Sequence, residues 1–359
     1  MRITHVDCFL VTVPAAKPAF FWRAGLAGSG PDSEGGVLLI ATDDGHEGVA
    51  FTRNGAILAD LVDRRLREEL IGADPRQREY LWHRMWEIDR IEEMPIYLLG
   101  LVDVALWDLA AKAAGEPLWR HLGGYRTEIP AYASTSTFGS TEEYLDIIDQ
   151  SLALGYPAIK LHAWGDARRD ARLCEAVREH VGANVPLMFD GSAGFDLPDA
   201  VLLGKVLSDL DFLWYEEPMR EFSIHAYQRL ADRVDVPLLL GETSDGAHLN
   251  MADFIVSGAA TAGVRTSVDL KGGVTGALRV AHLADAFRLR AEVHGPIVPH
   301  RHLCMAIPNT TYYESLVTSN PVVREAGIDG RGMVAAPTEP GIGLPAHLDY
   351  PRALAAHVK

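Results

Sequence analysis

The chain has 359 residues, of which 48% are hydrophobic and 23% charged, a composition that excludes a disordered chain or a coiled coil and leaves material for a large core. At roughly 150 residues per domain, this length indicates two domains, or one large barrel with an extra module. Charges interrupt every hydrophobic stretch, so we expect no membrane partner and a cytoplasmic protein, and the formal net charge of −16 would repel nucleic acid but not a small anionic substrate.

The first 125 residues have the pattern of a small α+β unit. Phe9, Val11 and Val13 alternate as in a first strand, and two apolar runs, 37–41 and 47–51, flank the turn Asp43-Asp44-Gly45 as in a hairpin. Helical periods follow over residues 56–70 and from about residue 95 to residue 114. This part therefore looks like a module attached to the rest of the chain.

From about Ile129 the pattern changes to short apolar runs that alternate with helical segments, which is typical of repeated βα units and a parallel sheet. Eight such runs can be counted, at residues 131–134, 158–161, 186–189, 212–215, 237–240, 263–266, 289–293 and 312–316. Eight units predict a closed (β/α)8 barrel with its chemistry at the C-terminal ends of the strands. An open doubly wound sheet is the structural alternative.

Motifs for other chemistries are missing from the sequence. No G-x-G-x-x-G or G-x-x-x-x-G-K-[ST] follows a predicted strand, so a nucleotide site has no support. The three cysteines stand far apart without metal or redox spacing, which excludes a disulfide framework and a zinc site.

Carboxylates end three consecutive predicted strands of the barrel. Asp190, Glu216 and Glu242 are separated from one another by 26 residues, one βα unit each, so they should lie at the same level of neighbouring strands. Three converging carboxylates need a cation to stay ionised together, and oxygen ligands suit Mg²⁺. Each one could instead cap the helix after its strand. Strand alternation lets only one of Glu216 and Glu217 face inward. We assign Glu216 as the ligand, and Glu217 as a group that either supports the ligands or pairs with a lysine.

Basic residues stand at two other predicted strand ends. Lys160 and His162 share a strand face because side chains i and i+2 point the same way, so both are expected to face the barrel axis. His294 ends the seventh run, across the barrel mouth from the second. His162 and His294 could therefore address opposite faces of one bound molecule, although a strand-end histidine is more often structural.

These residues, with several ordered motifs, resemble the mandelate racemase-like branch of the enolase superfamily. The motifs are Ala105-Leu-Trp-Asp-Leu-Ala-Ala-Lys112, Leu122-Gly-Gly124, Gly155-Tyr-Pro-Ala-Ile-Lys-Leu-His162, Glu216-Glu-Pro218, Gly241-Glu242, Gly272-Gly-Val-Thr-Gly276, Ala306-Ile-Pro-Asn309, Tyr313-Glu314 and Pro340-Gly-Ile-Gly343. The resemblance implies a capping domain (1–125), a modified TIM barrel (126–326) and a C-terminal segment (327–359) that returns to the cap. It also implies that Asp190, Glu216 and Glu242 bind Mg²⁺ while a base removes the proton α to a substrate carboxylate.

The same resemblance assigns roles to single residues. Lys160 resembles the first lysine of the family's K-x-K and His162 replaces the second, which is the base on one face. His294 resembles the base on the other face, and Glu314 the acid that hydrogen-bonds the reaction intermediate. Two family positions depart. The aspartate that orients the histidine is Ser267 here, with Asp269 and Glu292 as the two candidate replacements, and the asparagine two residues after the first metal ligand is Ser192.

The resemblance favours an acid-sugar dehydratase, a lyase that eliminates a β-hydroxyl to give a 2-keto-3-deoxy acid. A racemase or epimerase of 2-hydroxy acids and a barrel that binds metal and ligand without turnover are the alternatives. Trp22, Arg23 and Arg53 lie in loops that this family folds over the barrel, so they are candidates for binding the sugar acid, an aldonate or aldarate, together with Ser192 and Ser267; an aromatic strip packed between domains is the alternative for Trp22. We expect a homo-oligomer.

Overall fold

The N-terminal part is an antiparallel sheet covered by helices. The computed structural model describes residues 1–94, 96–345 and 348. Strands β1 (Ile3–Val13), β2 (Ser33–Thr42) and β3 (Glu47–Thr52) pair in the order β1-β2-β3, and the predicted hairpin turns at Gly45 with a positive φ of 84°, which suits glycine. Phe9, Val11 and Val13 are buried on one face of β1, so the first strand and the hairpin are confirmed.

Helices follow this sheet in the order α1 (Gly55–Leu61), a π-helical turn (Val62–Leu66), α2 (Arg67–Leu70), α3 (Arg78–Glu92), α4 (Ile96–Ala113) and α5 (Leu118–His121). Helix α4 is buried along most of its length because it packs on β3, α3 and the barrel helix α11. A β-carbon on Gly100 would lie 2.7 Å from the backbone of Gly272 and Gly273, so glycine lets α4 approach the barrel closely. In the described residues, no helix is long and apolar enough to cross a membrane.

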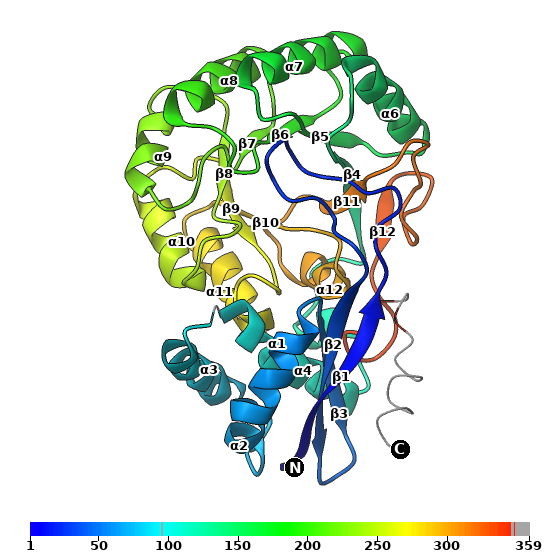
Figure 1. The fold of residues 1–359 in the computed structure, drawn as a ribbon, viewed down its shortest axis with the longest axis vertical. Helices are drawn as coiled ribbons and strands as arrows, with labels where there is room; N and C mark the ends of the chain where they lie inside the picture. Colours follow the sequence, from blue (N-terminus) through cyan, green and yellow to red (C-terminus); the bar gives the residue numbers. More distant parts are fainter. Residues whose placement is uncertain (95, 346–347, 349–359) are drawn as a thin grey trace.

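The rest of the chain forms a curled parallel sheet with helices outside it (Figure 1). The parallel strands are β4 (Glu128–Thr135), β5 (Ala158–His162), β6 (Leu187–Asp190), β7 (Trp214–Glu216), β8 (Leu238–Leu240), β9 (Gly263–Thr266), β10 (Arg290–Val293) and β11 (Tyr313–Val317). The helices between them are α6 (Thr141–Ala153), α7 (Ala167–Val181), α8 (Leu197–Asp209), α9 (Ile224–Ala231), α10 (Ala247–Val256), α11 (Gly273–Ala286) and α12 (Val298–Ala306). All eight strands are found where the sequence predicts them.

The eight strands form a modified barrel. Their order runs from β10 back through β4 to β11, and β10 and β11 share no ladder within the described residues. Antiparallel β12 (Met333–Ala335) pairs with the start of β4. The fold is therefore the α+β cap with a modified (β/α)8 barrel, as predicted, and the doubly wound alternative is wrong.

The described part of segment 327–359 reaches the N-terminal unit. Ile342 N donates to Asp108 Oδ1 at 2.6 Å, and Trp119 Nε1 donates to Pro337 O at 2.7 Å. Residues 346–347 and 349–359 of this predicted segment lie outside the described residues, and the domain boundaries stay predictions.

Candidate active site

Alternation along the strands places the carboxylates inside the barrel. Tyr132, Ala158, Met188, Trp214 and Leu239 fill a layer of the interior, and the side chains two residues later on the same face include Lys160, Asp190 and Glu216. The register of the ladders agrees, because Asp190 pairs with Glu216 and His162 pairs with Asp190. Glu242 lies three residues after Leu239, and the intervening Gly241 has a φ of 90°, which breaks the alternation at this point.

Asp190, Glu216 and Glu242 each offer an oxygen within 4.8 Å of the others. Asp190 Oδ1 accepts a hydrogen bond from Ser192 N at 2.8 Å, which fixes the first carboxylate. Burial, together with the charges of Asp190 and Glu216, raises the pKa of Glu242 to about 8. A cation would relieve this repulsion, and the buried oxygen donors suit Mg²⁺. The residues present therefore fit the magnesium that the sequence predicts.

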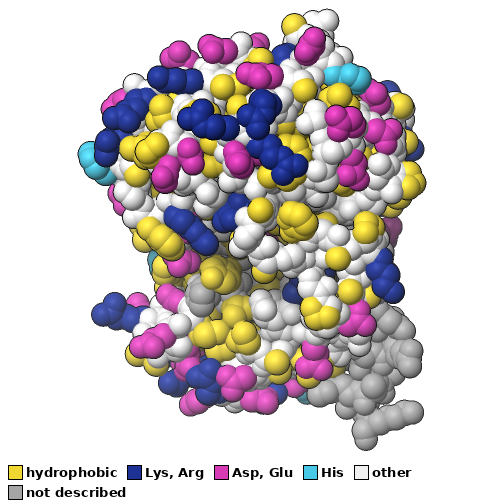
Figure 2. Space-filling model, turned by 45° about the horizontal axis from the view of Figure 1, so that its top comes forward, with side chains coloured by type: hydrophobic (Ala, Val, Ile, Leu, Met, Phe, Trp, Pro, Cys, Tyr) yellow, Lys and Arg dark blue, Asp and Glu magenta, His cyan; other side chains and the backbone are white. Residues whose placement is uncertain are grey.

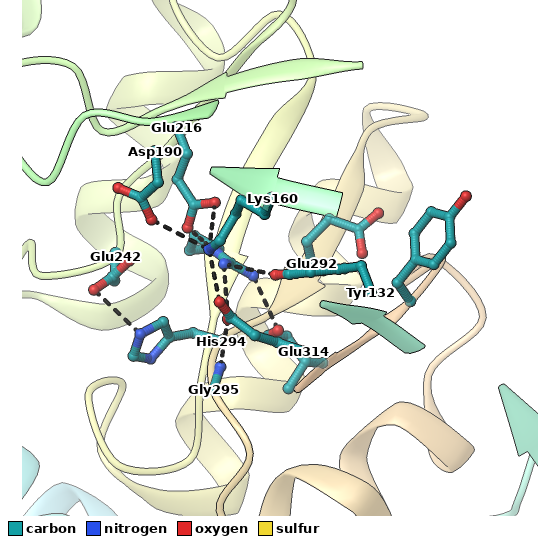
Figure 3. A network of polar contacts seen from close by, with 12 residues as sticks. Tyr132, Lys160, Asp190, Glu216, Glu242, Glu292, His294, Gly295 and Glu314 are labelled. Atoms are coloured by element: carbon teal, nitrogen blue, oxygen red, sulfur yellow. Dashed lines mark hydrogen bonds and ion pairs between the residues drawn. The ribbon is translucent and has the colours of Figure 1, made fainter. Parts of the chain in front are cut away.

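Lys160 lies at the centre of an ionic network (Figure 3). Its Nζ lies 3.2 Å from Asp190 Oδ2, 3.0 Å from Glu216 Oε2 and 2.7 Å from Glu314 Oε1. Burial alone would lower the pKa of Lys160, but the charges of Glu216 and Glu314 hold it well above its usual value. Lys160 is therefore an ammonium that neutralises its neighbours.

Arg265 extends the network to the other side of the barrel. Its Nε binds Glu216 Oε1, and its Nη2 lies 3.0 Å from Glu314 Oε2 and 3.1 Å from Tyr132 Oη. Its Nη1 donates to Val293 O at 2.9 Å. One guanidinium thus holds both the second carboxylate of the triad and Glu314.

His162 has a fixed ring. Its Nδ1 donates to the backbone oxygen of Thr135 at 2.7 Å, which leaves Nε2 facing the triad. Nε2 lies 3.1 Å from Asp190 Oδ2, and the Trp22 ring packs against the imidazole with centroids 4.7 Å apart. The orientation of the His162 ring is therefore determined by Thr135, Asp190 and Trp22.

His294 is held differently. Its Nε2 lies 3.2 Å from Glu242 Oε1, but Nδ1 is buried without a hydrogen-bond partner in the described part of the chain. Burial lowers the pKa of His294. Ser267 Oγ instead accepts from Leu270 N at 3.2 Å, and Glu292 accepts hydrogen bonds from Thr310 and Thr311.

Asp269 lines the same cavity as His294. Its Oδ1 has no hydrogen-bond partner among the described residues, because the neighbouring Nε2 of His300, at 3.4 Å, already accepts from Val268 N. Burial would raise the pKa of Asp269, but the neighbouring His300, and to a smaller extent the charge of His294, lower it to about 2. Of the two suggested replacements for the missing aspartate, Asp269 is the one near His294.

A cavity of about 290 Å³ lies above the triad. It is lined by Trp22, Leu26, Lys160, His162, Asp190, Ser192, Ala193, Glu217, Arg220, Glu242, Thr243, Asp269, His294, Gly295, Pro296, Ile297, His300, Glu314 and Leu316. Among the predicted substrate-binding residues, Trp22 and Ser192 line it. Neither Ser267, which is buried, nor Arg53, which is exposed, lines the cavity.

The segment between β1 and β2 covers this cavity. Figure 1 shows it crossing from the N-terminal sheet to the barrel near β5 and β6. Phe21 O accepts from Thr137 N at 2.9 Å, Ala24 N donates to Trp164 O at 3.3 Å, and Arg23 Nε donates to Ser192 O at 2.8 Å. Arg23 therefore fastens this segment to the barrel, and its role in substrate binding stays a prediction.

Two family models match this chain. Residues 143–349 match "Enolase C-terminal domain-like", and residues 32–123 match "Mandelate racemase / muconate lactonizing enzyme, N-terminal domain". The chain belongs to the mandelate racemase/muconate lactonizing enzyme family of the enolase superfamily. The predicted family is thus confirmed.

Several other proteins resemble the chain over most of its length. An L-talarate/galactarate dehydratase from Salmonella typhimurium is 28% identical, with 90% of this chain and 84% of that protein covered. A 3,6-anhydro-alpha-L-galactonate cycloisomerase from Streptomyces coelicolor is 30% identical, covering 88% and 89%. The solved D-glucarate dehydratase from Agrobacterium tumefaciens, complexed with magnesium, has a TM-score of 0.90 at 31% identity, covering 99% of this chain and 98% of that chain.

Two arginines of this enolase-superfamily site were not found by sequence reasoning. The sequence does carry a signal for Arg265, because a charged residue in the short buried run 263–266 needs a partner inside the barrel. Arg220 lines the cavity from the loop after β7. Nothing in the local sequence distinguishes it from a solvent-exposed arginine.

Proposed function

We propose that this protein is a Mg²⁺-dependent dehydratase of sugar acids. The observation that carries the proposal is the placement of two imidazoles at the two ends of the carboxylate triad, His162 beside Asp190 and His294 beside Glu242. Dehydration needs a base for the α-proton and an acid for the β-hydroxyl. The similar dehydratases support the choice of substrate class.

The residues divide the reaction between them. His162 Nε2 removes the α-proton, because its other nitrogen is engaged by Thr135 O, and the electron pair of the C–H bond moves toward the carboxylate. When bound, Mg²⁺ supplies positive charge that stabilises this developing negative charge. The ammonium of Lys160 adds positive charge beside the same triad. Lys160 therefore stabilises negative charge, and His162 is the base.

Elimination completes the reaction. The electron pair returns to form the C=C bond as the β C–O bond breaks, and protonated His294 donates its proton so that water leaves. The resulting enol takes a proton at carbon 3 and becomes the 2-keto-3-deoxy acid. Glu314, held by Lys160 and Arg265, lies at the cavity wall and remains a candidate for hydrogen bonding to the reacting carboxylate.

Racemisation or epimerisation is the second candidate. The two imidazoles at opposite ends of the triad could also remove a proton on one face and return one on the other. Nδ1 of His294 has no hydrogen-bond partner among the described residues, which favours a third outcome, binding without turnover, because an unsupported imidazole is a weaker acid–base catalyst.

The three candidates are separated by incubating the protein with Mg²⁺ and a library of aldonates and aldarates in D₂O. A 2-keto acid, trapped as its semicarbazone, indicates dehydration; α-deuterium alone indicates racemisation or epimerisation. Absence of both across the library would favour a binding protein.

The variant His294→Asn tests the assignment of roles. It should abolish dehydration and leave exchange at the His162 end, while His282→Asn, a change of an exposed histidine on α11, should alter neither. If dehydration and exchange both survive in His294→Asn, the assignment is wrong.

A further inference from the structure

Arg23, which fastens the covering segment, and Arg220, which lines the cavity, differ in their partners. Arg23 is engaged, because its Nε donates to Ser192 O at 2.8 Å and its Nη1 donates to Ala24 O at 2.9 Å. Its side chain also passes over Gly194, where an added β-carbon would lie 2.7 Å from Arg23 Cδ. Arg220 lines the cavity from the loop between β7 and α9 and has no hydrogen-bond or ion-pair partner among the described residues.

The charge of Arg220 influences Arg23. Burial lowers the pKa of Arg23, and the positive charge of Arg220 lowers it further. The molecule as a whole carries a formal net charge of −16, and Figure 2 shows acidic and basic side chains interspersed over the face it presents. Arg220 is exposed and is bonded to no carboxylate within the described residues, so its guanidinium is free to pair with an anion that enters the cavity.

The cavity already has one site for a carboxylate. The triad with Lys160 lies at one end, where the proposed α-proton abstraction takes place. The rest of the lining includes apolar side chains, Trp22, Leu26 and Ile297 among them, while Ser192 and Thr243 add hydroxyl groups. Within the described residues Arg220 forms no hydrogen bond or ion pair with the triad, so its guanidinium is available to a second charged group of the substrate.

We propose that the substrate is an aldarate, a sugar acid with a carboxylate at each end, and that Arg220 binds the carboxylate distant from the metal. This inference rests on the proposed function and narrows its substrate class. A guanidinium binds a carboxylate through two parallel, charge-assisted hydrogen bonds. The terminal CH₂OH of an aldonate offers no such charge, so the matched aldonate binds more weakly.

The test compares matched pairs, an aldarate and the aldonate of the same configuration, with wild-type protein and the variants Arg220→Met and Arg220→Lys. Wild type should have the higher kcat/KM for the aldarate. Arg220→Met should raise KM for the aldarate by about 10- to 100-fold, with kcat nearly unchanged and the aldonate affected by less than about twofold. Arg220→Lys should recover part of the loss, because it retains the charge.

The matched control is Arg229→Met, which removes an exposed arginine of α9 outside the cavity and should change neither substrate. The inference is overturned if wild type uses the aldonate at least as well, or if Arg220→Met weakens both members of a pair equally.

Calorimetric titration of the Mg²⁺-loaded protein with the same pairs supplies a readout that does not need turnover. Tighter aldarate binding that Arg220→Met removes supports the inference even if no substrate is dehydrated, in which case only the proposed function fails. Equal binding of aldarate and aldonate overturns the inference, whether or not dehydration is observed.

Discussion

The two imidazoles at the ends of the triad differ in how the protein supports them. His162 donates from Nδ1 to Thr135 O at 2.7 Å and packs against Trp22, whereas Nδ1 of His294 is buried without a hydrogen-bond partner in the described part of the chain. A fixed Nδ1–H presents Nε2 as the base before substrate arrives. Two histidines in similar places thus differ in how firmly the protein orients their rings. His162, which is the better oriented, is the better candidate for proton abstraction.

Removal of the metal should have the largest effect on activity, because His162 and His294 both lie beside the same carboxylate triad. We expect chelation with EDTA, or the change Asp190→Asn, to lower dehydration and α-deuterium exchange by at least about 10³-fold, measured by NMR in D₂O. Readdition of Mg²⁺ should restore only the wild type. The control is Asp149→Asn, which removes an exposed carboxylate bonded to His180. Exchange that persists in EDTA would contradict the shared role of the triad.

Loss of the supported imidazole comes next. His162→Gln should lower α-deuterium exchange and dehydration together by about 10²- to 10⁴-fold, the usual contribution of a general base. His282→Gln, on the exposed side of α11, serves as the control. If exchange is unchanged in His162→Gln, proton abstraction belongs to the His294 end and the comparison is reversed.

A third histidine, His302, limits the pH range in which the activities of His162 and His294 can be compared. His302 accepts from Trp119 N at 3.2 Å and donates to Ile342 O at 3.1 Å, and burial lowers its pKa to about 4. Because the folded pKa lies below the unfolded value, the contribution to stability is complete above about pH 6.5 and is lost as the pH falls toward 4.

This loss should amount to about 3 kcal/mol in the free energy of unfolding near pH 4, measured by denaturant titration between pH 4 and 7.5. His302→Gln should flatten this dependence, while His282→Gln should leave it in place. A pH dependence that is the same in His302→Gln and in wild type would show that other groups cause the acid sensitivity.

Weakening the support of His162 should have the smallest effect. Trp22→Leu removes the ring that packs on the imidazole and should lower exchange at the His162 end by up to about tenfold, the range of an aromatic pair. Phe222→Leu, a change of a highly exposed ring, is the control. An unaltered rate in Trp22→Leu would mean that the Thr135 hydrogen bond alone orients His162.

The fold was predictable where local patterns decide it. The eight apolar runs and the hairpin at Asp43-Asp44-Gly45 were found because alternation and turn residues are local signals. Helix α3 was not predicted, although Leu81, Trp82, Met85 and Ile88 are buried along it at helical spacing. That signal was present in the sequence.

The site was predictable where it depends on strand register. The interval of 26 residues placed Asp190, Glu216 and Glu242 at one level, and the structure brings them together. The position of Arg220 depends on the path of a loop, and that of Arg53, outside the cavity, on how the N-terminal unit docks. Neither is determined by local sequence, so neither could be predicted from it.

Arg265 has a consequence for the integrity of the barrel itself. Strands β10 and β11 share no backbone ladder within the described residues, yet the guanidinium reaches Val293 O on β10, Glu314 on β11 and Glu216 on β7. This side chain thus adds contacts between two strands that share no ladder and ties both of them to β7. Redesign of the loops on either side of that seam should therefore keep Arg265, since an apolar residue of similar volume could fill the space but could not join the three strands.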